Sequence, residues 1–177
     1  MTKKTRAGRR RGMLLTKAKL KMFMGEVGSI VATTIKAQTF DQGKGLDDRP
    51  HKRHSQLSDK KSFGAYSYTW GRVRAGLAKH PGSKTNRGVR DTSKVTLEYT
   101  GSLRRQIQVL SGITTSSVTV GIIGNAGNYA GFVHKLRPFL GVSKKGWKLV
   151  EIQVHDLFAL MVKQHDASKA IRRAKKK

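Results

Sequence analysis

The sequence predicts an α+β fold, in which a small antiparallel β-sheet packs with a long N-terminal and a long C-terminal helix. Apolar residues recur every three or four positions over 13–37 and again from about Ser143, which is the spacing of a buried helix face. Between these stretches, β-branched residues cluster over 106–110 and 117–123 on either side of a turn at 112–115. That pattern is typical of a β-hairpin.

The first predicted helix covers 13–37. Gly25 and Gly28 interrupt it, and each weakens a helix by about 1 kcal/mol relative to alanine. Packing must therefore hold this helix, and we expect a close neighbour over the glycines.

Residues 38–96 are expected to include long basic loops within the same domain. The first part, 38–66, is polar, poor in aliphatic residues and rich in Gly, Asp and Ser, which favours a loop. A short helix is predicted after it, because Trp70, Val73 and Leu77 stand at helical spacing. A loop of this length is usually functional or ordered by a partner.

The second half of the chain has the clearest pattern. Thr100 can cap a short helix that runs through Leu103 into the hairpin. Residues 124–127 then turn the chain into a helix over 129–135, and 137–141 is extended. The face of the final helix is marked by Trp147, Val150, Val154, Phe158 and Met161.

Charge divides the chain into one domain, 13–168, and two basic arms, 1–12 and 169–177. The sequence holds 37 Lys and Arg against 10 Asp and Glu, a net charge of +27. The cations of the arms are Lys3, Lys4, Arg6, Arg9, Arg10, Arg11, Lys169, Arg172, Arg173, Lys175, Lys176 and Lys177. A chain this basic repels itself, so we expect the arms to contact an acidic protein surface or DNA.

Several classes of function are disfavoured. The absence of cysteine excludes disulfides and thiol nucleophiles and fits a reducing cytoplasm. No apolar run is long enough for a signal peptide or a membrane span, so we expect no membrane partner. Only Asp47 and Asp48 are adjacent among the scattered acids, which offers no carboxylate pair for acid–base catalysis. We therefore expect no enzyme activity and no cofactor.

Three local patterns resemble ligand sites. His51 and His54 lie near Asp47 and Asp48, but a structural zinc site needs about four ligands, and a solvated loop is the alternative. The glycines at 121, 124 and 127 lack the spacing of a dinucleotide-binding loop, and a tight strand-to-helix turn explains them. Residues 82–85 contain the letters of a phosphate loop in the wrong order, which indicates a basic loop.

Cations also alternate with aromatic residues before and within the predicted short helix. The residues concerned are Phe63, Tyr66, Tyr68, Trp70, Arg72 and Arg74. Such a surface can bind nucleic acid, with cations on phosphates and rings on bases. The alternative is that Trp70 and one tyrosine belong to the core.

Four short motifs resemble, in this order, those of the phage virion morphogenesis or tail-completion family. They are Tyr99-Thr100-Gly101-Ser102-Leu103-Arg104-Arg105, Val118-Thr119-Val120-Gly121, Asn128-Tyr129-Ala130 with His134, and Arg137-Pro138-Phe139-Leu140-Gly141. In that family a T-G-x-L helix start leads into a hairpin ending V-x-V-G, followed by Y-A-x-x-H and R-P-F-L-G before a final helix. The resemblance covers about 97–165. The chain departs from it at His134-Lys135-Leu136, where the family has a longer turn, and at Lys144 and Lys145, where acids are usual.

The resemblance implies a structural virion protein, either a head-tail connector in the neck or a tail terminator that completes the tail. Such a subunit would assemble in the host cytoplasm into a homo-oligomeric ring of roughly six or twelve copies. Its neighbours would be the portal or connector and tail proteins, with genomic DNA in the channel. Structural roles are implied for Thr100, Gly101, Leu103, Gly121, Tyr129, Ala130, His134, Arg137, Pro138, Phe139, Leu140 and Gly141. The alternative, favoured by a pI near 11.1, is a sequence-independent nucleic-acid-binding protein.

Overall fold

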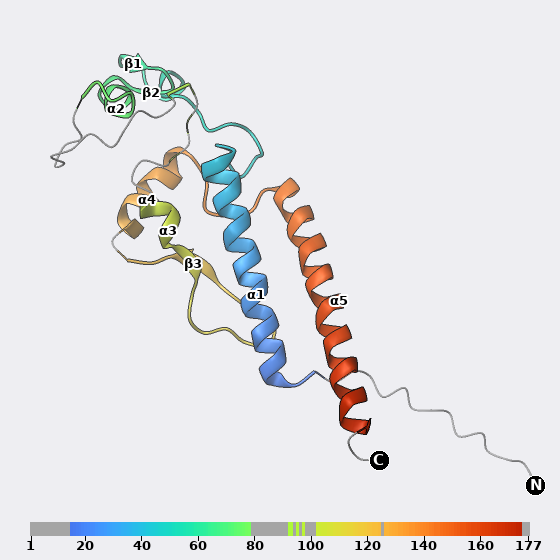
Figure 1. Cartoon of the computed structure of the whole chain (residues 1–177). Helices are drawn as coiled ribbons and strands as arrows, with labels where there is room; N and C mark the ends of the chain where they lie inside the picture. The colour runs from blue at the N-terminus through green and yellow to red at the C-terminus, as the bar shows by residue number, and fades with distance from the viewer. Residues whose placement is uncertain are drawn as a thin grey trace, which may run out of the picture.

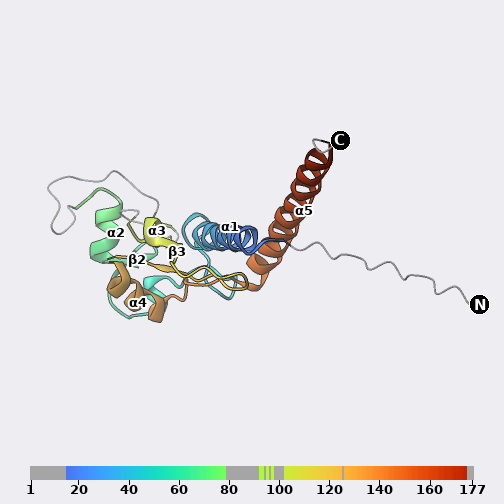
Figure 2. The same ribbon diagram turned by 90° about the horizontal axis from the view of Figure 1, so that it is seen from below.

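Two long helices and a β-hairpin form the body of the protein. The computed structural model describes residues 15–78, 92–93, 95, 97, 102–124 and 126–174. Helices α1 (Lys17–Lys36) and α5 (Lys144–Ala174) run side by side (Figure 1). The antiparallel strands β3 (Ile107–Val109) and β4 (Val120–Ile122) pack on another side of α1, which lies between the hairpin and α5 (Figure 2). The predicted α+β fold is confirmed, although α5 packs mainly on α1 and not over the sheet.

Helix α1 begins at Lys17, later than predicted, because Thr16 caps it. The Oγ1 atom of Thr16 accepts a hydrogen bond from the Lys19 N–H at 3.3 Å. At its other end, α1 continues into a π-helical turn, η1 (Ala37–Asp41), whose Phe40 is buried in the core. The prediction of a loop from residue 38 is therefore wrong at its start. The burial of Phe40 extends the helix into that segment.

The neighbour expected over the glycines of α1 is the hairpin. A Cβ atom on Gly28 would lie 2.7 Å from Val118 Cγ2 and 2.9 Å from Val109 Cγ2. At Gly25 the nearest atom would be Ile113 Cδ1, at an ordinary contact distance of 3.6 Å. Only Gly28 is therefore required by the packing of α1 on the hairpin.

Residues 42–78 contain more structure than predicted. The short elements η2 (His54–Gln56), β1 (Ser62–Phe63) and β2 (Tyr66–Ser67) precede α2 (Tyr68–Arg74), which is the predicted short helix. Together β1, β2 and α2 form a small lobe at one end of the molecule (Figure 1). Val73 is buried in this lobe, as the spacing predicted. Trp70 and Leu77 are exposed by 42% and 60%, so the expected apolar face was wrong for them.

The elements of the second half follow the predicted order. They are α3 (Ser102–Gln106), the hairpin, α4 (Ala126–Leu136) and α5. The tight turn of the hairpin lies at 114–117 and not at 112–115, because the Thr114 N–H donates to the Ser117 carbonyl at 3.0 Å. Gly124 has a φ of +71° where the chain turns from β4 into α4. This glycine therefore fits the strand-to-helix turn that was expected.

The core lies where α1, η1, the hairpin, α3 and α4 meet. Its buried residues are Ala32, Ile35, Phe40, Leu103, Ile107, Ala130, Val133 and Phe139. Helix α5 continues to Ala174, so residues 169–174, which were expected to belong to an arm, are its last turns. Among the described residues, no helix combines the length and apolar character needed to cross a membrane.

Candidate functional site

The family-like motifs meet in the core, next to the start of α5. Leu103 and Ala130 are buried core residues, and Phe139 is fully buried. His134 Nδ1 accepts hydrogen bonds from the backbone N–H groups of Phe139 and Leu140, both at 3.2 Å. The His134 ring also packs edge-on against the Phe139 ring. His134 therefore shapes the turn that inserts Phe139 into the core.

The rest of the last motif ties this turn to the loop after α1. Arg137 Nε donates to the Lys52 carbonyl at 3.0 Å, and the Pro138 carbonyl accepts from the Leu46 N–H at 3.3 Å. Gly141 has a φ of +154°, and a Cβ there would lie 2.9 Å from Leu46 Cδ2. Glycine is therefore required at 141 both by backbone conformation and by space.

The remaining predicted site residues are placed only in part. Gly121 lies in β4, where a Cβ would lie 2.9 Å from Leu110 Cδ1, and Leu140 is partly exposed. Tyr129 belongs to α4, but its side chain lies outside the described part of the chain, as do those of Phe63, Lys169, Arg172 and Arg173. Also outside the described residues are Lys3, Lys4, Arg6, Arg9, Arg10, Arg11, Thr100, Gly101, Lys175, Lys176, Lys177 and the loop at 82–85.

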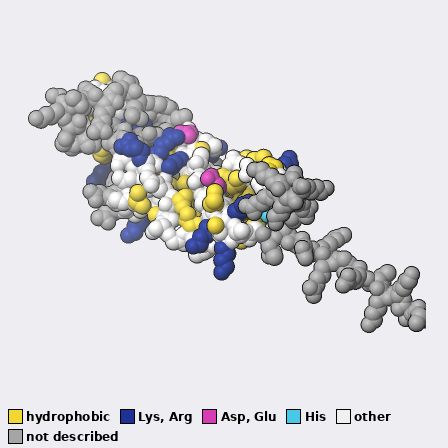
Figure 3. Space-filling model, turned by 60° about the horizontal axis from the view of Figure 1, so that its bottom comes forward, with side chains coloured by type: hydrophobic (Ala, Val, Ile, Leu, Met, Phe, Trp, Pro, Cys, Tyr) yellow, Lys and Arg dark blue, Asp and Glu magenta, His cyan; other side chains and the backbone are white. Residues whose placement is uncertain are grey.

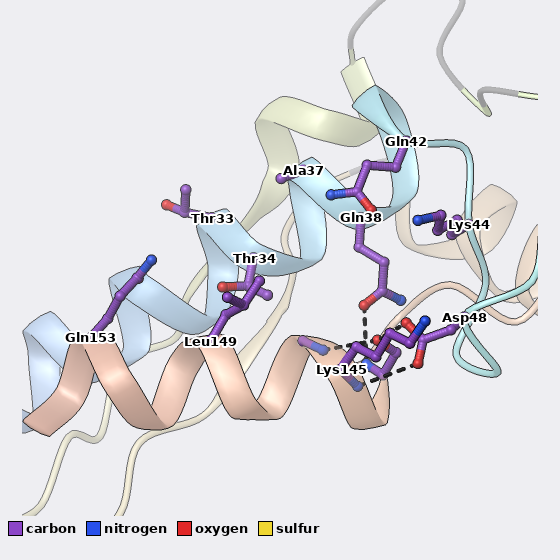
Figure 4. A pocket seen from close by; sticks show the side chains of 12 residues that line it. Thr33, Thr34, Ala37, Gln38, Gln42, Lys44, Asp48, Lys145, Leu149 and Gln153 are labelled. Atoms are coloured by element: carbon purple, nitrogen blue, oxygen red, sulfur yellow. Dashed lines mark hydrogen bonds between the residues drawn. The ribbon is translucent and has the colours of Figure 1, made fainter.

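A polar cluster that the sequence did not reveal fixes the start of α5 (Figure 4). The side chain of Gln38, in η1, is buried and accepts from the Ser143 N–H at 3.0 Å. Ser143 Oγ donates to Asp48 Oδ1 at 2.5 Å and accepts from the Gly146 N–H at 3.1 Å, as an N-cap does. The hydrogen bond from Ser143 is the main cause that lowers the pKa of Asp48 below its usual value.

The groove above this cluster has a volume of about 320 Å³ and is lined partly by Thr33, Leu149 and Gln153. The polar atoms of the cluster hydrogen-bond with one another, so the cluster is explained as a cap for α5. Ser143, just before an apolar helical pattern, was a visible signal of that cap. Gln38 and Asp48 gave no signal, because they lie about 100 residues away in sequence.

The two histidines do not form a metal site. No group of three or more His, Asp or Glu side chains that could hold a metal occurs among the described residues. His51 is only 6% exposed, which corrects the expectation of a solvated loop. Desolvation, with the nearby charge of Arg137, lowers the pKa of His51 to about 4. His51 is therefore a buried, neutral side chain under the loop that Arg137 helps to hold.

The cationic and aromatic residues of the small lobe divide into two groups. The Arg74 guanidinium lies 4.5 Å from the centre of the half-buried Tyr66 ring and is itself buried, so Arg74 is not a free surface cation. At the surface, Lys61 Nζ lies 4.5 Å and the Arg72 guanidinium 5.7 Å from the centre of the Tyr68 ring. These contacts hold two cations near one aromatic ring.

Trp70 does not belong to the core, contrary to one of the two interpretations of the sequence. It is 42% exposed, and it follows Tyr68 by two positions, which is about 200° around a helix. Trp70 and Tyr68 therefore do not share one face of α2, and the lobe offers no continuous stacking surface from these two rings.

An apolar groove of about 280 Å³ lies between α1, the hairpin and the start of α5. It is lined by Val27, Val31, Ile35, Val118, Val120, Leu140, Gly141, Val142 and Trp147. Within the described part of the chain, no charged or hydroxyl side chain contributes to this lining. Figure 3 shows hydrophobic side chains gathered at the surface with Lys and Arg around them.

Helix α5 carries a second apolar surface on its other side, which we call the outer face. It contains Ile152 and Leu160, which are exposed by 58% and 55%. At about 100° per residue, both lie within about 40° of the direction opposite Trp147. Trp147 of α5 therefore faces the apolar groove of about 280 Å³, whereas Ile152 and Leu160 face solvent on the opposite side of the helix.

Comparisons of the chain with protein-family models, with curated proteins and with solved structures give no match.

Proposed function

We propose that this chain is a structural subunit of a tailed bacteriophage, which joins head to tail or completes the tail as part of a ring. The observation that carries the proposal is the pair of apolar surfaces on opposite sides of α5, because a monomer leaves both in water. Exposed apolar patches of this kind mark sites of protein association. The four motifs within 97–165 occur in the same order as in the phage family, and this resemblance relates the association to the phage neck and tail.

Two different surfaces on one subunit suit a ring. A contact between unlike surfaces is heterologous, and repeated copies close into a ring when the rotation between neighbours closes. The motif residues Phe139, His134 and Gly141 support this role by anchoring the start of α5 to the core. In the virion the ring would lie between the portal side and the tail. Its task depends on shape and needs no reactive group.

Electron microscopy and light scattering of the purified chain test the proposal. The chain is examined alone and mixed with the portal and tail proteins of a phage whose genome encodes it. We expect rings, formed either by the chain alone or on the partner proteins, and we expect the chain in purified particles. A chain that ignores these partners and is missing from the particles would contradict the proposal.

Sequence-independent nucleic-acid binding is a second candidate function, favoured by the small lobe. Residues 49–78 hold seven Lys or Arg side chains and one acid, Asp59. Lys61 and Arg72 are both held over the Tyr68 ring, so two of these cations are pre-positioned. Binding at this lobe predicts that Lys61→Gln with Arg72→Gln lowers the salt slope of duplex binding by about two. An unchanged salt slope would contradict nucleic-acid binding at this lobe.

A further inference from the structure

The outer face of α5 carries charge as well as apolar side chains. Asp156 stands four residues after Ile152 and four before Leu160, and Lys163 follows Leu160 by three. These spacings place both charges on the outer face. Asp156 and Lys163 are exposed, and within the described part of the chain neither forms an ion pair.

The groove side of α5 carries the opposite charges at the same separation. Lys144 and Glu151 lie about 60° and 40° around the helix from Trp147, and both are exposed. They too form no ion pair among the described residues. Lys144 and Glu151 are seven residues apart, as are Asp156 and Lys163, which corresponds to about 10.5 Å along a helix.

We propose that the outer face of α5 in one copy packs into the apolar groove of a second copy of this chain, with the two helices parallel. In this register Asp156 of one copy faces Lys144 of the next, and Lys163 faces Glu151. Leu160 then comes level with Trp147, so apolar side chains meet between the two charged pairs. The inference rests on the ring assembly proposed above and names the contact that builds it.

The two kinds of contact have different tasks. Burial of Leu160 and Ile152 in the groove supplies the affinity, because both are more than half exposed in the single chain. The charged pairs at the rim contribute less to affinity and mainly select partner and orientation. Each copy offers one groove and one outer face, so the contact repeats from head to tail. The occupant is another copy because complementary charge and apolar surface are present on the same chain.

Charge swaps at constant net charge test this register. Asp156→Lys with Lys163→Glu reverses the outer face, and Lys144→Glu with Glu151→Lys reverses the groove side, while both variants keep the net charge of +27. Self-association of the full chain is measured by analytical ultracentrifugation over a concentration series at fixed ionic strength. We expect each swap alone to weaken association about tenfold and the two together to restore it.

The apolar part of the contact is tested separately. Ile152→Asp should abolish association, whereas Phe132→Asp on α4, which changes a side chain that is 63% exposed, should leave it unchanged. Circular dichroism checks the helix content of every variant. Swaps without effect, a combined variant that stays weak, or a wild-type chain that remains monomeric at all concentrations would overturn the inference.

These outcomes are separate from those of the proposed function. Rings that form with phage proteins but ignore both swaps would overturn the register and leave the phage role standing. Association with the expected charge dependence, by a chain that never enters phage particles, would support the contact and contradict the phage role.

Discussion

Phe139 is the residue on which the packing of the second half depends most. It is the largest fully buried side chain of the described structure, and it enters the core from the turn between α4 and α5. Phe139→Ala should therefore lower the free energy of unfolding by about 3–5 kcal/mol. Urea denaturation measures the change. Phe132→Ala is the control, because this side chain is largely exposed, and it should change stability by about 0.5 kcal/mol or less.

His51 should make stability depend on pH. Its pKa is about 4 in the folded chain, below the usual 6.5, so between these values the unfolded chain takes up a proton that the folded chain does not. The free energy of unfolding should fall as pH drops from about 6.5 to about 4, and should stop falling on account of His51 below that.

The contribution of His51 is isolated by comparing urea midpoints of the wild type and His51→Gln at several pH values. The other five histidines are common to both chains and cancel in the difference. Asp48 does not interfere, because its lowered pKa places its loss of stability below the usual value of 3.8. A difference that is constant from pH 7 to pH 4 would contradict the prediction.

At the level of elements, the two glycines of α1 should respond to alanine with opposite sign. Gly28→Ala should destabilise the protein by about 1–2 kcal/mol, because its Cβ would clash with Val118 and Val109 of the hairpin. Gly25→Ala should stabilise it by about 0.5–1 kcal/mol, since its Cβ has room and alanine favours the helix. Thermal or urea unfolding measures both. Equal effects at the two positions would show that α1 does not pack on the hairpin as described.

The sequence predicted those elements whose signal is local. The apolar repeats of α1 and α5, and the alternating strands at 107–109 and 120–122, are visible within one window of residues. The sequence did not predict the π-helical turn after α1, because that turn depends on the packing of Phe40 in a core built from distant residues. The start of α5 was visible through Ser143, whereas its contact with Gln38 spans 105 residues and leaves no local trace.

The candidate surfaces were predicted only in part for the same reason. The repeat that includes Trp147 and Phe158 identified one face of α5. Which side chains stay exposed depends on where α1 packs, so the groove and the outer row with Ile152 emerge only from the structure. The two charge pairs with equal spacing, Asp156 with Lys163 and Lys144 with Glu151, can be recognised as complementary only once those two surfaces are known.

For the whole molecule, the ends of the chain should contribute charge and little stability. Deletion of 1–12 and 169–177 removes 12 cations and no acid, so the net charge falls from +27 to +15. We expect the free energy of unfolding to change by about 0.5 kcal/mol or less, because the sequence of neither segment carries an apolar helix face. Urea denaturation of the shortened chain checks this. Loss of cooperative unfolding would show that an end segment is part of the domain.

A rise in salt concentration should have opposite effects on the two candidate functions, self-association and DNA binding. Copies that each carry +27 repel one another, and this repulsion is screened over about 10 Å at 0.1 M salt. Self-association through apolar surfaces should therefore strengthen as salt rises. Binding to duplex DNA should weaken, because salt opposes the release of counterions from phosphates.

Light scattering from 50 mM to 500 mM salt, with and without DNA, measures both self-association and DNA binding. Stronger association in salt without DNA favours the ring subunit, whereas a monomer that coats DNA only at low salt favours the nucleic-acid-binding alternative.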